Sequence, residues 1–304
     1  MNLSDLRMFV GVTQHASLHA AATHLNVTPS ALSKAIRRLE DDLRSPLFDR
    51  SGKTLQLNAG GQRLLERALV LLHLADQTRA EFEGADYRVR CRIAAPALLQ
   101  WRYGTAIAEI LADRYADSSL VLRPTYENEA LAALMRGEVD FALVTGEALA
   151  TTPAGAHFQA VALGALTMQL AAGLRHPLAA NARGKTVRAS RASVFQHDFV
   201  CPTRSMFCGI ERGMHSDGWR DEQLPRRIRY WVDDLQVLLS LVQSGKALAY
   251  LPQFAVAECG LVKIQVRDMP IDCSESAHLV WRPAAAAGWQ SVVVEQIQKI
   301  TMPV

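Results

Sequence analysis

The stretch "SLHAAATHLNVTPSALSKAIRRLE" (residues 17–40) contains two segments with apolar residues at helical spacing, separated by a short Asn-Val-Thr-Pro break. Ser17 is suited to cap a first helix, and Thr28, followed by Pro29, is suited to cap a second. This pattern predicts a helix-turn-helix whose second helix enters the major groove of DNA. A helical hairpin inside a larger bundle, with a solvated basic face, is the alternative interpretation. The second helix would expose small hydroxyl and basic side chains at Ser30, Ser33, Lys34, Arg37 and Arg38.

The residues after the second helix favour a short β-hairpin. The stretch "PLFDRSGKTLQL" (residues 46–57) alternates apolar and polar residues on either side of Ser-Gly. A hairpin beside a recognition helix is a wing, so we predict a winged helix-turn-helix domain over residues 1–58. Its tip, with Ser51 between two basic residues, is suited to contact phosphates. The residues expected to contact DNA are Thr28, Pro29, Ser30, Ser33, Lys34, Arg37 and Arg38 in the helix, and Arg50 and Lys53 in the wing.

Residues 59–89 predict a long linker helix capped by Asn58. A single helix with one apolar stripe, placed between two globular units, has little to bury against its own chain. We therefore expect it to pack against the same helix of a second subunit, which gives a homodimer. The residues expected at that dimer interface are Leu64, Leu65, Ala68, Leu69, Leu72 and Ala75.

From about residue 91 the pattern changes to strands that alternate with helices, which is typical of α/β domains with parallel sheets. The last strand and helix are expected to return to the first sheet. Strands are expected at 90–95, 118–126, 140–146, 198–205, 227–234, 247–252 and 278–283, with the stretch from 166 opening a second series. Helices are expected at 101–116, 128–139, 206–217, 234–244 and 288–300.

The sequence "LRMFVGVTQHASLHAAATHLNVTPSALSKAIRRLEDDLRSPLFDR" (residues 6–50) resembles the helix-turn-helix and wing of LysR-type transcriptional regulators almost position by position. The resemblance extends along the whole chain and is most specific over residues 3–61. Two positions depart from the family's pattern. Arg44 stands where the family usually has a glycine that closes the recognition helix, and "LNAGG" (57–61) replaces the usual start of the linker helix. We expect Arg44 to lie near the left-handed region of backbone space.

This resemblance implies an effector-binding regulatory domain over residues 90–304. It would comprise two Rossmann-like lobes similar to periplasmic binding proteins, lobe I at about 90–163 and 267–304 and lobe II at about 164–266. The expected function is an activator or repressor of transcription that is controlled by a small molecule bound between the lobes. Its expected partners are double-stranded promoter DNA, a second or further copies of the chain in a homodimer or homotetramer, and RNA polymerase.

Ligands of open parallel sheets bind beyond the carboxyl ends of the strands. Relatives commonly place a Ser or Thr after the first strand, where this chain has only apolar residues from Ala95 to Leu99. Apolar side chains at Leu98, Trp101, Met206 and Phe207 would line the cleft, so we predict an aromatic or otherwise apolar effector. Its one acidic group would be held by Thr203 or Ser205. In the alternative interpretation, Thr145, Thr203 and Ser205 only cap helices. The predicted effector-binding residues are Pro96, Ala97, Leu98, Leu99, Trp101, Thr145, Thr203, Ser205, Met206 and Phe207.

Two of the five cysteines raise the alternative of a redox-sensing regulator. Some relatives sense oxidants through a cysteine pair in the second lobe, and Cys201 and Cys208 flank one expected strand-to-helix turn here. Arg204 is close enough in sequence to lower the pKa of a thiol. Buried structural cysteines are the competing interpretation.

Composition sets the remaining expectations. The formal net charge is only +3, so the arrangement of charge matters more than its sum. The N-terminus lacks the uninterrupted apolar run of a signal peptide, and no apolar stretch is long enough to cross a membrane, so we expect a cytoplasmic protein without a membrane partner. No Gly-x-Gly-x-x-Gly, Walker or His-Glu-x-x-His motif occurs. We therefore expect no enzyme activity, no metal site and no cofactor.

Overall fold

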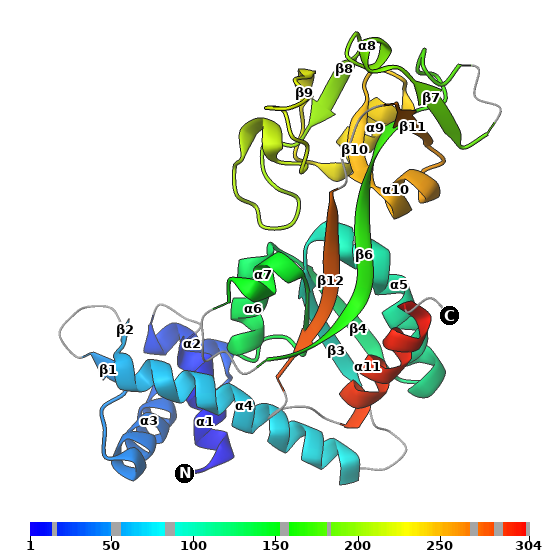
Figure 1. The fold of residues 1–304 in the computed structure, drawn as a ribbon. Coiled ribbons are helices and arrows are strands. Elements are labelled where there is room, and N and C mark those ends of the chain that lie inside the picture. Colours follow the sequence, from blue (N-terminus) through cyan, green and yellow to red (C-terminus); the bar gives the residue numbers. More distant parts are fainter. Residues whose placement is uncertain are drawn as a thin grey trace.

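The structure is a computed structural model that describes residues 1–13, 17–49, 56–82, 89–152, 158–180, 184–267, 273–282 and 288–301. A helical N-terminal unit leads through the long helix α4 into two α/β lobes, which two long strands join (Figure 1). None of the helices in these ranges combines the length and apolar character needed to cross a membrane.

The N-terminal unit contains the helix-turn-helix that the capping residues predict. The Ser17 hydroxyl accepts a hydrogen bond from the backbone N–H of Ala20 at 3.2 Å, and the Thr28 hydroxyl accepts one from Ala31 at 3.1 Å. Arg44 ends the second helix with a φ of 51°, the left-handed conformation expected of it. The three helices are α1 (Leu3–Thr13), α2 (Leu18–His24) and α3 (Pro29–Leu43).

A two-stranded hairpin follows α3 and is tied to the linker helix. Strands β1 (Phe48–Asp49) and β2 (Gln56–Leu57) pair antiparallel, and α4 (Ala59–Phe82) begins directly after them. The Asn58 side chain accepts a hydrogen bond from the N–H of Gly61 at 2.8 Å and donates one to the carbonyl of Pro46 at 2.9 Å, so it caps α4 and holds it to the hairpin. The predicted tip residues Arg50, Ser51 and Lys53 lie outside the described residues.

Helix α4 buries much of its apolar stripe within its own chain. Leu64, Ala68 and Leu72 are buried in one hydrophobic core with Leu6 and Phe9 of α1. The expectation that α4 has little to bury against its own chain is therefore wrong, because α1 covers part of the stripe. The remaining predicted interface residues, Leu65, Leu69 and Ala75, are partly buried, and a different face of α4 exposes Leu71 and Leu74, whose exposed fractions are 37% and 46%.

Lobe I is built on parallel strands, as predicted. Strand β3 pairs in parallel with β4 and β5, while β12 pairs antiparallel with β5 and with β6, so the chain returns to this sheet near its C-terminus. Helices α5 and α11 pack together on the sheet (Figure 1). The elements are β3 (Arg90–Ala95), α5 (Ala97–Arg114), β4 (Ser119–Pro124), α6 (Glu127–Met135), β5 (Phe141–Thr145), α7 (Gly146–Ala150), β6 (Gln159–Ala172), β12 (Ser274–Trp281) and α11 (Gly288–Thr301).

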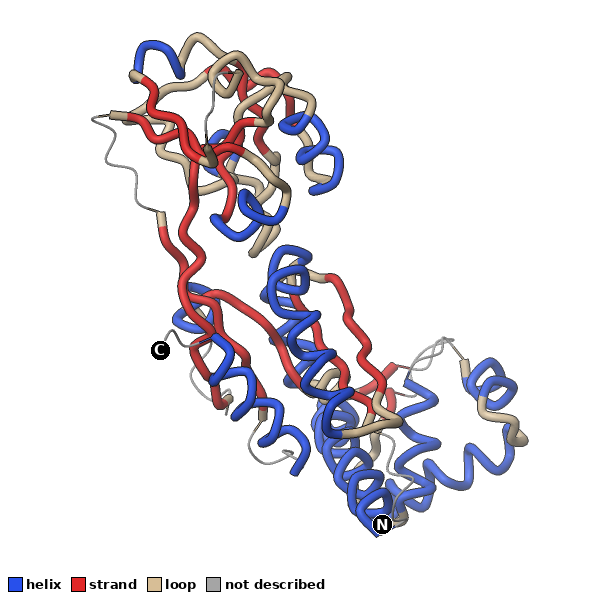
Figure 2. The backbone as a smooth tube through the Cα atoms, turned by 90° about the vertical axis from the view of Figure 1, so that its right-hand side faces the viewer, coloured by secondary structure: helices blue, strands red, loops and turns tan. Residues whose placement is uncertain are grey.

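Strand β6 continues from lobe I into lobe II, as Figures 1 and 2 show. Its first part pairs with β12 and its second part with β10 and β11, so the main sheet runs in the order β4-β3-β5-β12-β6-β11-β7. The predicted lobe boundary at residue 163 falls inside this strand. Lobe II further contains β7 (Thr186–Ala189), α8 (Arg191–Val194), β8 (Asp198–Cys201), β9 (Arg227–Trp231), α9 (Leu235–Gln243), β10 (Ala249–Pro252), α10 (Gln253–Glu258) and β11 (Val262–Val266).

The helix expected at 206–217 is wrong. These residues form a loop with one short 3-10 turn, Gly213–His215. Gly209 and Gly213 have positive φ values of 70° and 55°, which interrupt any helix, and a side chain placed on Gly209 would collide with the ring of Tyr126 in lobe I. The loop therefore takes its shape from contact with the other lobe. The spacing of apolar residues along the sequence does not predict such a contact.

Candidate DNA-binding and effector sites

Helix α3 divides its side chains as a recognition helix requires. Leu32, Ala35, Ile36 and Leu39 are buried in the N-terminal core, which fixes the orientation of the opposite face. On that opposite face, Ser33 is partly buried. The exposed candidates are Thr28, Pro29, Ser30, Lys34, Arg37 and Arg38.

Arg38 differs from the other basic residues of α3 because it is already paired. Its guanidinium makes two hydrogen bonds to the Asp5 carboxylate of α1, at 2.5 and 2.9 Å. These hydrogen bonds lower the pKa of Asp5, against the effect of its burial. Lys34 and Arg37 make no ion pair with any described residue. Arg38 thus fixes α3 against α1, while Lys34 and Arg37 are free to contact DNA.

Two cavities lie between the lobes. The larger, here called the apolar cavity, has a volume of about 720 Å³. It contains six of the predicted effector residues: Pro96, Ala97, Leu98, Trp101, Ser205 and Met206. The rest of its wall includes Tyr126, Leu235 and Leu239, with Arg204, Asp233 and Asp234 as its charged residues.

Leu99 does not line either cavity, which corrects the prediction. Helix α5 begins at Ala97 rather than near residue 101, and this start turns Leu99 toward the sheet, where it is fully buried in the core of lobe I. Pro96 precedes α5 and provides no side-chain cap. The first N–H groups of α5 therefore lack an intrahelical acceptor at the cavity wall, where a helix favours an anion.

Thr203 also lies outside both cavities, because Asp233 engages it. The Thr203 hydroxyl donates to the Asp233 carboxylate at 2.5 Å, and the backbone N–H groups of Thr203 and Arg204 donate to the same carboxylate at 2.7 and 3.1 Å. Burial raises the pKa of Asp233, but these hydrogen bonds outweigh it and lower the pKa overall. Thr203 therefore positions the loop that follows it, and the prediction that it holds the effector is corrected.

The hydroxyl of Ser205, unlike that of Thr203, remains available to a ligand. Ser205 is only 7% exposed and lines both cavities. Its oxygen accepts long hydrogen bonds from the N–H groups of Phe207 and Cys208, at 3.3 and 3.4 Å. Within the described ranges, no acceptor is recorded for its own hydrogen, so this hydroxyl can donate to a ligand.

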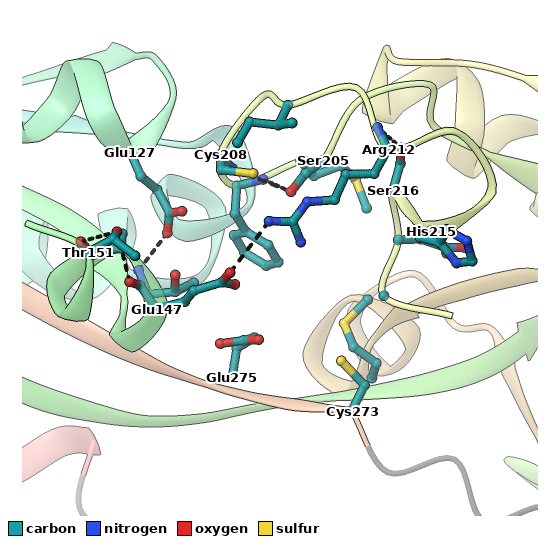
Figure 3. A pocket seen from close by; sticks show the side chains of 18 of the residues that line it. Glu127, Glu147, Thr151, Ser205, Cys208, Arg212, His215, Ser216, Cys273 and Glu275 are labelled. Atoms are coloured by element: carbon teal, nitrogen blue, oxygen red, sulfur yellow. Dashed lines mark hydrogen bonds and ion pairs between the residues drawn. The ribbon is translucent and has the colours of Figure 1, made fainter. Parts of the chain in front are cut away.

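The smaller cavity, here called the acidic cavity, has a volume of about 380 Å³ and also contains the predicted Thr145 and Phe207. Figure 3 shows three carboxylates that surround it, from Glu127 at the start of α6, Glu147 of α7 and Glu275 of β12. Burial raises the pKa of Glu127, and the charges of Glu147 and Glu275 raise it further, while hydrogen bonds from Thr145 oppose this shift.

The loop between β8 and β9 closes the cleft from the side of lobe II. The N–H of Glu127 donates to the carbonyl of Phe207 at 3.2 Å, and Arg212 lies 3.5 Å from the carboxylate of Glu147. Both contacts join the lobes. Because Ser205 and Met206 belong to both walls, this loop separates the two cavities.

Sequence reasoning missed Glu127, Tyr126 and Glu275. The first two directly follow β4, so the rule for strand ends would have found them had it been applied to that strand. Glu275 lies inside an antiparallel strand that crosses the cleft, and no local pattern indicates such a position.

The geometry around Cys201 does not favour a redox pair. This thiol is fully buried, and burial raises its pKa to about 12, whereas a reactive thiol needs a lowered pKa. The guanidinium beside it is that of Arg226, at 3.5 Å, rather than that of Arg204. Cys208 lies elsewhere, in the wall of the acidic cavity.

Comparison with known proteins agrees with this architecture. An uncharacterized HTH-type transcriptional regulator of Mycobacterium tuberculosis is 33% identical over 123 residues, which are 40% of this chain and only 38% of that relative. ArgP from Mycobacterium tuberculosis has a similar fold, with a TM-score of 0.68, 18% identity and coverage of 98% of this chain and 96% of ArgP. Full-length CbnR, solved in complex with its target DNA, has a TM-score of 0.58 at 18% identity, with 98% of this chain and 99% of CbnR covered.

Family models match both parts of the chain. Residues 3–62 match the bacterial regulatory helix-turn-helix protein model of the lysR family. Residues 85–288, more than half of the 304 residues, match the LysR substrate binding domain. The chain therefore belongs to the LysR family of bacterial transcriptional regulators.

Proposed function

We propose that this protein is a sequence-specific DNA-binding regulator whose activity responds to a small molecule in the cleft between its lobes. The observation that supports the proposal most strongly is the orientation of α3. Its apolar face is buried in the N-terminal core, and Lys34 and Arg37 are exposed on the other face. The solved complex of CbnR with its target DNA supports DNA as the partner. We propose no catalytic role, and we propose that the protein acts in the cytoplasm, where it activates or represses transcription by RNA polymerase.

Replacing Lys34 or Arg37 by alanine should weaken binding to the preferred DNA sequence by about 1 to 3 kcal/mol and relax the base preference at one position. The measurement is fluorescence anisotropy with the preferred duplex and with single-base variants of it. Arg114→Ala is the matched control, because this arginine is exposed at the far end of α5. If both α3 variants kept the affinity and preference of the Arg114→Ala control, α3 would not be the reading helix.

We further propose a homodimer, or a homotetramer built from such dimers, that uses α4. Its available apolar surface is the face with Leu71 and Leu74, since Leu64, Ala68 and Leu72 are buried against α1. Ala75 borders this face, whereas Leu65 and Leu69 lie on the other side of the buried stripe. Two α3 helices would then read two half-sites related by the symmetry of the dimer.

The effector proposed for the apolar cavity has an aromatic or other apolar body and one acidic group. Leu98, Trp101 and Met206 provide the apolar wall. The uncapped start of α5 and the hydroxyl of Ser205 provide hydrogen-bond donors for the acidic group. Small-molecule sites are usually lined mainly by apolar side chains, together with a few well-placed polar groups.

Ser205→Ala should weaken the binding of such an acid by about tenfold, because one charge-assisted hydrogen bond contributes roughly 1.5 to 3 kcal/mol. A panel of aromatic and aliphatic acids is titrated by calorimetry into the full chain to select the probe. Ser193→Ala, in the short helix α8 away from both cavities, is the control. Equal affinities for Ser205→Ala and Ser193→Ala would exclude Ser205 as the anchor.

A further inference from the structure

We propose that the acidic cavity is a second ligand site, which binds a small organic cation such as a primary amine or a guanidinium compound. This inference rests on the proposed function, because it adds a second signal to the same regulatory domain. The wall of this cavity contains a buried carboxylate residue, Glu127, which is 3% exposed.

Glu127 differs from the other buried carboxylates of the described chain. Five carboxylate residues are buried there, and four of them have an arginine nitrogen within 3.1 Å. The four pairs are Asp5 with Arg38, Asp140 with Arg92, and Asp217 and Asp221 with Arg226. Glu127 accepts a hydrogen bond from the N–H of Thr145 at 2.6 Å, but no cation among the described residues pairs with it. A buried carboxylate without a cation is either protonated or paired with a positive group from outside the chain, and a bound amine would provide that positive group.

The surroundings of Glu127 add negative charge. Glu147 and Glu275 line the same cavity, and Figure 3 shows the three carboxylates around one open volume. Arg212 reaches this group at a distance of 3.5 Å from Glu147, but its side chain is 41% exposed. His215 lies 3.3 Å from Glu222, which does not line the cavity. One exposed guanidinium thus faces three carboxylates.

The rest of the wall indicates an organic ligand rather than a metal ion. Met168, Met206, Phe207 and Ile210 provide apolar surface. The described residues include no group of three His, Cys, Asp or Glu side chains arranged to hold a metal ion. A volume of about 380 Å³ lies at the small end of ligand pockets and fits a compact molecule with a charged head and an apolar body.

Occupancy of this cavity should be coupled to the apolar cavity. A cation at Glu147 would replace Arg212, whose ion pair with Glu147 joins the two lobes. Ser205 and Met206 line both cavities, so a ligand in either one contacts the same loop. Because coupling between two binding sites is reciprocal, an acid in the apolar cavity and a cation in the acidic cavity should alter each other's affinity by the same factor.

The test is calorimetric titration of the full chain with phenethylamine and agmatine, and with phenethyl alcohol as the uncharged counterpart. We expect at least one amine to bind and the alcohol not to bind. Glu127→Gln, which keeps an oxygen to accept the N–H of Thr145, should weaken amine binding about tenfold or more. Glu129→Gln is the matched control, because this residue lies on the same helix, exposed and outside both cavities.

A thermal melt without ligand shows whether the variants are folded, and we expect Glu127→Gln to melt no lower than the natural chain. If Glu127→Gln does not fold, Glu275→Gln takes its place with the same expected direction. The proposal is overturned if neither amine binds, if the alcohol binds as tightly as the amine, or if the glutamine variant binds the amine with unchanged affinity. DNA binding and the response of Ser205→Ala to acids would be unaffected by that failure, so the proposed function is tested separately.

Discussion

Replacing Arg226 by alanine should lower the free energy of unfolding of lobe II by about 3 to 5 kcal/mol, the largest single effect we expect in this protein. Arg226 has no exposed side-chain surface and makes ion pairs with Asp217 at 2.7 Å and with Asp221 at 3.1 Å, which are equally buried. Its guanidinium also lies 5.1 Å from the ring centroid of Trp219. Without Arg226, two carboxylates would remain buried with no cation beside them, and burial already raises the pKa of Asp221.

The measurement is denaturant unfolding followed by tryptophan fluorescence, since Trp219 lies in the core of lobe II. Arg229→Ala is the control. Arg229 lies on β9, which begins directly after Arg226. It pairs with Asp198, but its side chain is 65% exposed, so its loss should cost less than about 1 kcal/mol. An equal loss in the free energy of unfolding for Arg226→Ala and Arg229→Ala would contradict the importance of the buried ion pairs.

Lowering the pH from 7.5 to 5 should destabilise lobe II by about 2 kcal/mol through His176 alone. Burial, together with the neighbouring His197, lowers the pKa of His176 from 6.5 to about 4, and the side chain accepts a hydrogen bond from the N–H of Leu178. Between pH 6.5 and pH 4, His176 is therefore protonated in the unfolded chain but not in the folded chain. Stability is complete above about pH 6.5 and is lost progressively as the pH falls through that window.

His176→Asn removes the titration and retains an oxygen that can accept the N–H of Leu178. Urea unfolding at both pH values should show a smaller loss of stability on acidification for this variant than for the natural chain. His19→Asn, at an exposed position of α2, should leave the acid sensitivity unchanged. An undiminished loss in His176→Asn would mean that other groups cause the acid sensitivity.

Local chemistry was sufficient to predict the N-terminal unit from the sequence. Thr28 and Pro29 fix the start of α3 because a cap needs only its own helix, and the left-handed Arg44 follows from the same local geometry. The alternation of strands and helices likewise predicted two series of α/β elements, and the family resemblance implied that these form two lobes. The return of β12 to the first sheet is confirmed by its pairing with β5.

The predictions that failed depended on contacts between distant segments. The stripe of α4 was assigned wholly to a second subunit, but α1 covers Leu64, Ala68 and Leu72. The loop at 206–217 looked helical in sequence, yet its shape depends on Gly209 packing against Tyr126 of the other lobe.

The position of the effector site could be predicted from the sequence, but its separation into two cavities could not. Strand ends identified Ser205 and Met206, yet the separation into an apolar and an acidic cavity depends on a loop that lies across the cleft. The choice between Thr203 and Ser205 depended on Asp233, thirty positions further along the chain, whose carboxylate engages Thr203. This pairing joins two segments of lobe II that are distant in sequence, so it arises only once that lobe is folded.

The central claim is that α3 reads a specific DNA sequence, and selection from a library of random duplexes by the full chain tests it most directly. We predict enrichment of one motif with two half-sites related by two-fold symmetry, together with loss of preference at one position per half-site for Lys34→Ala or Arg37→Ala. Retention of all duplexes alike, with an affinity that depends only on salt, would contradict the claim, because that behaviour is typical of non-specific contact with phosphates.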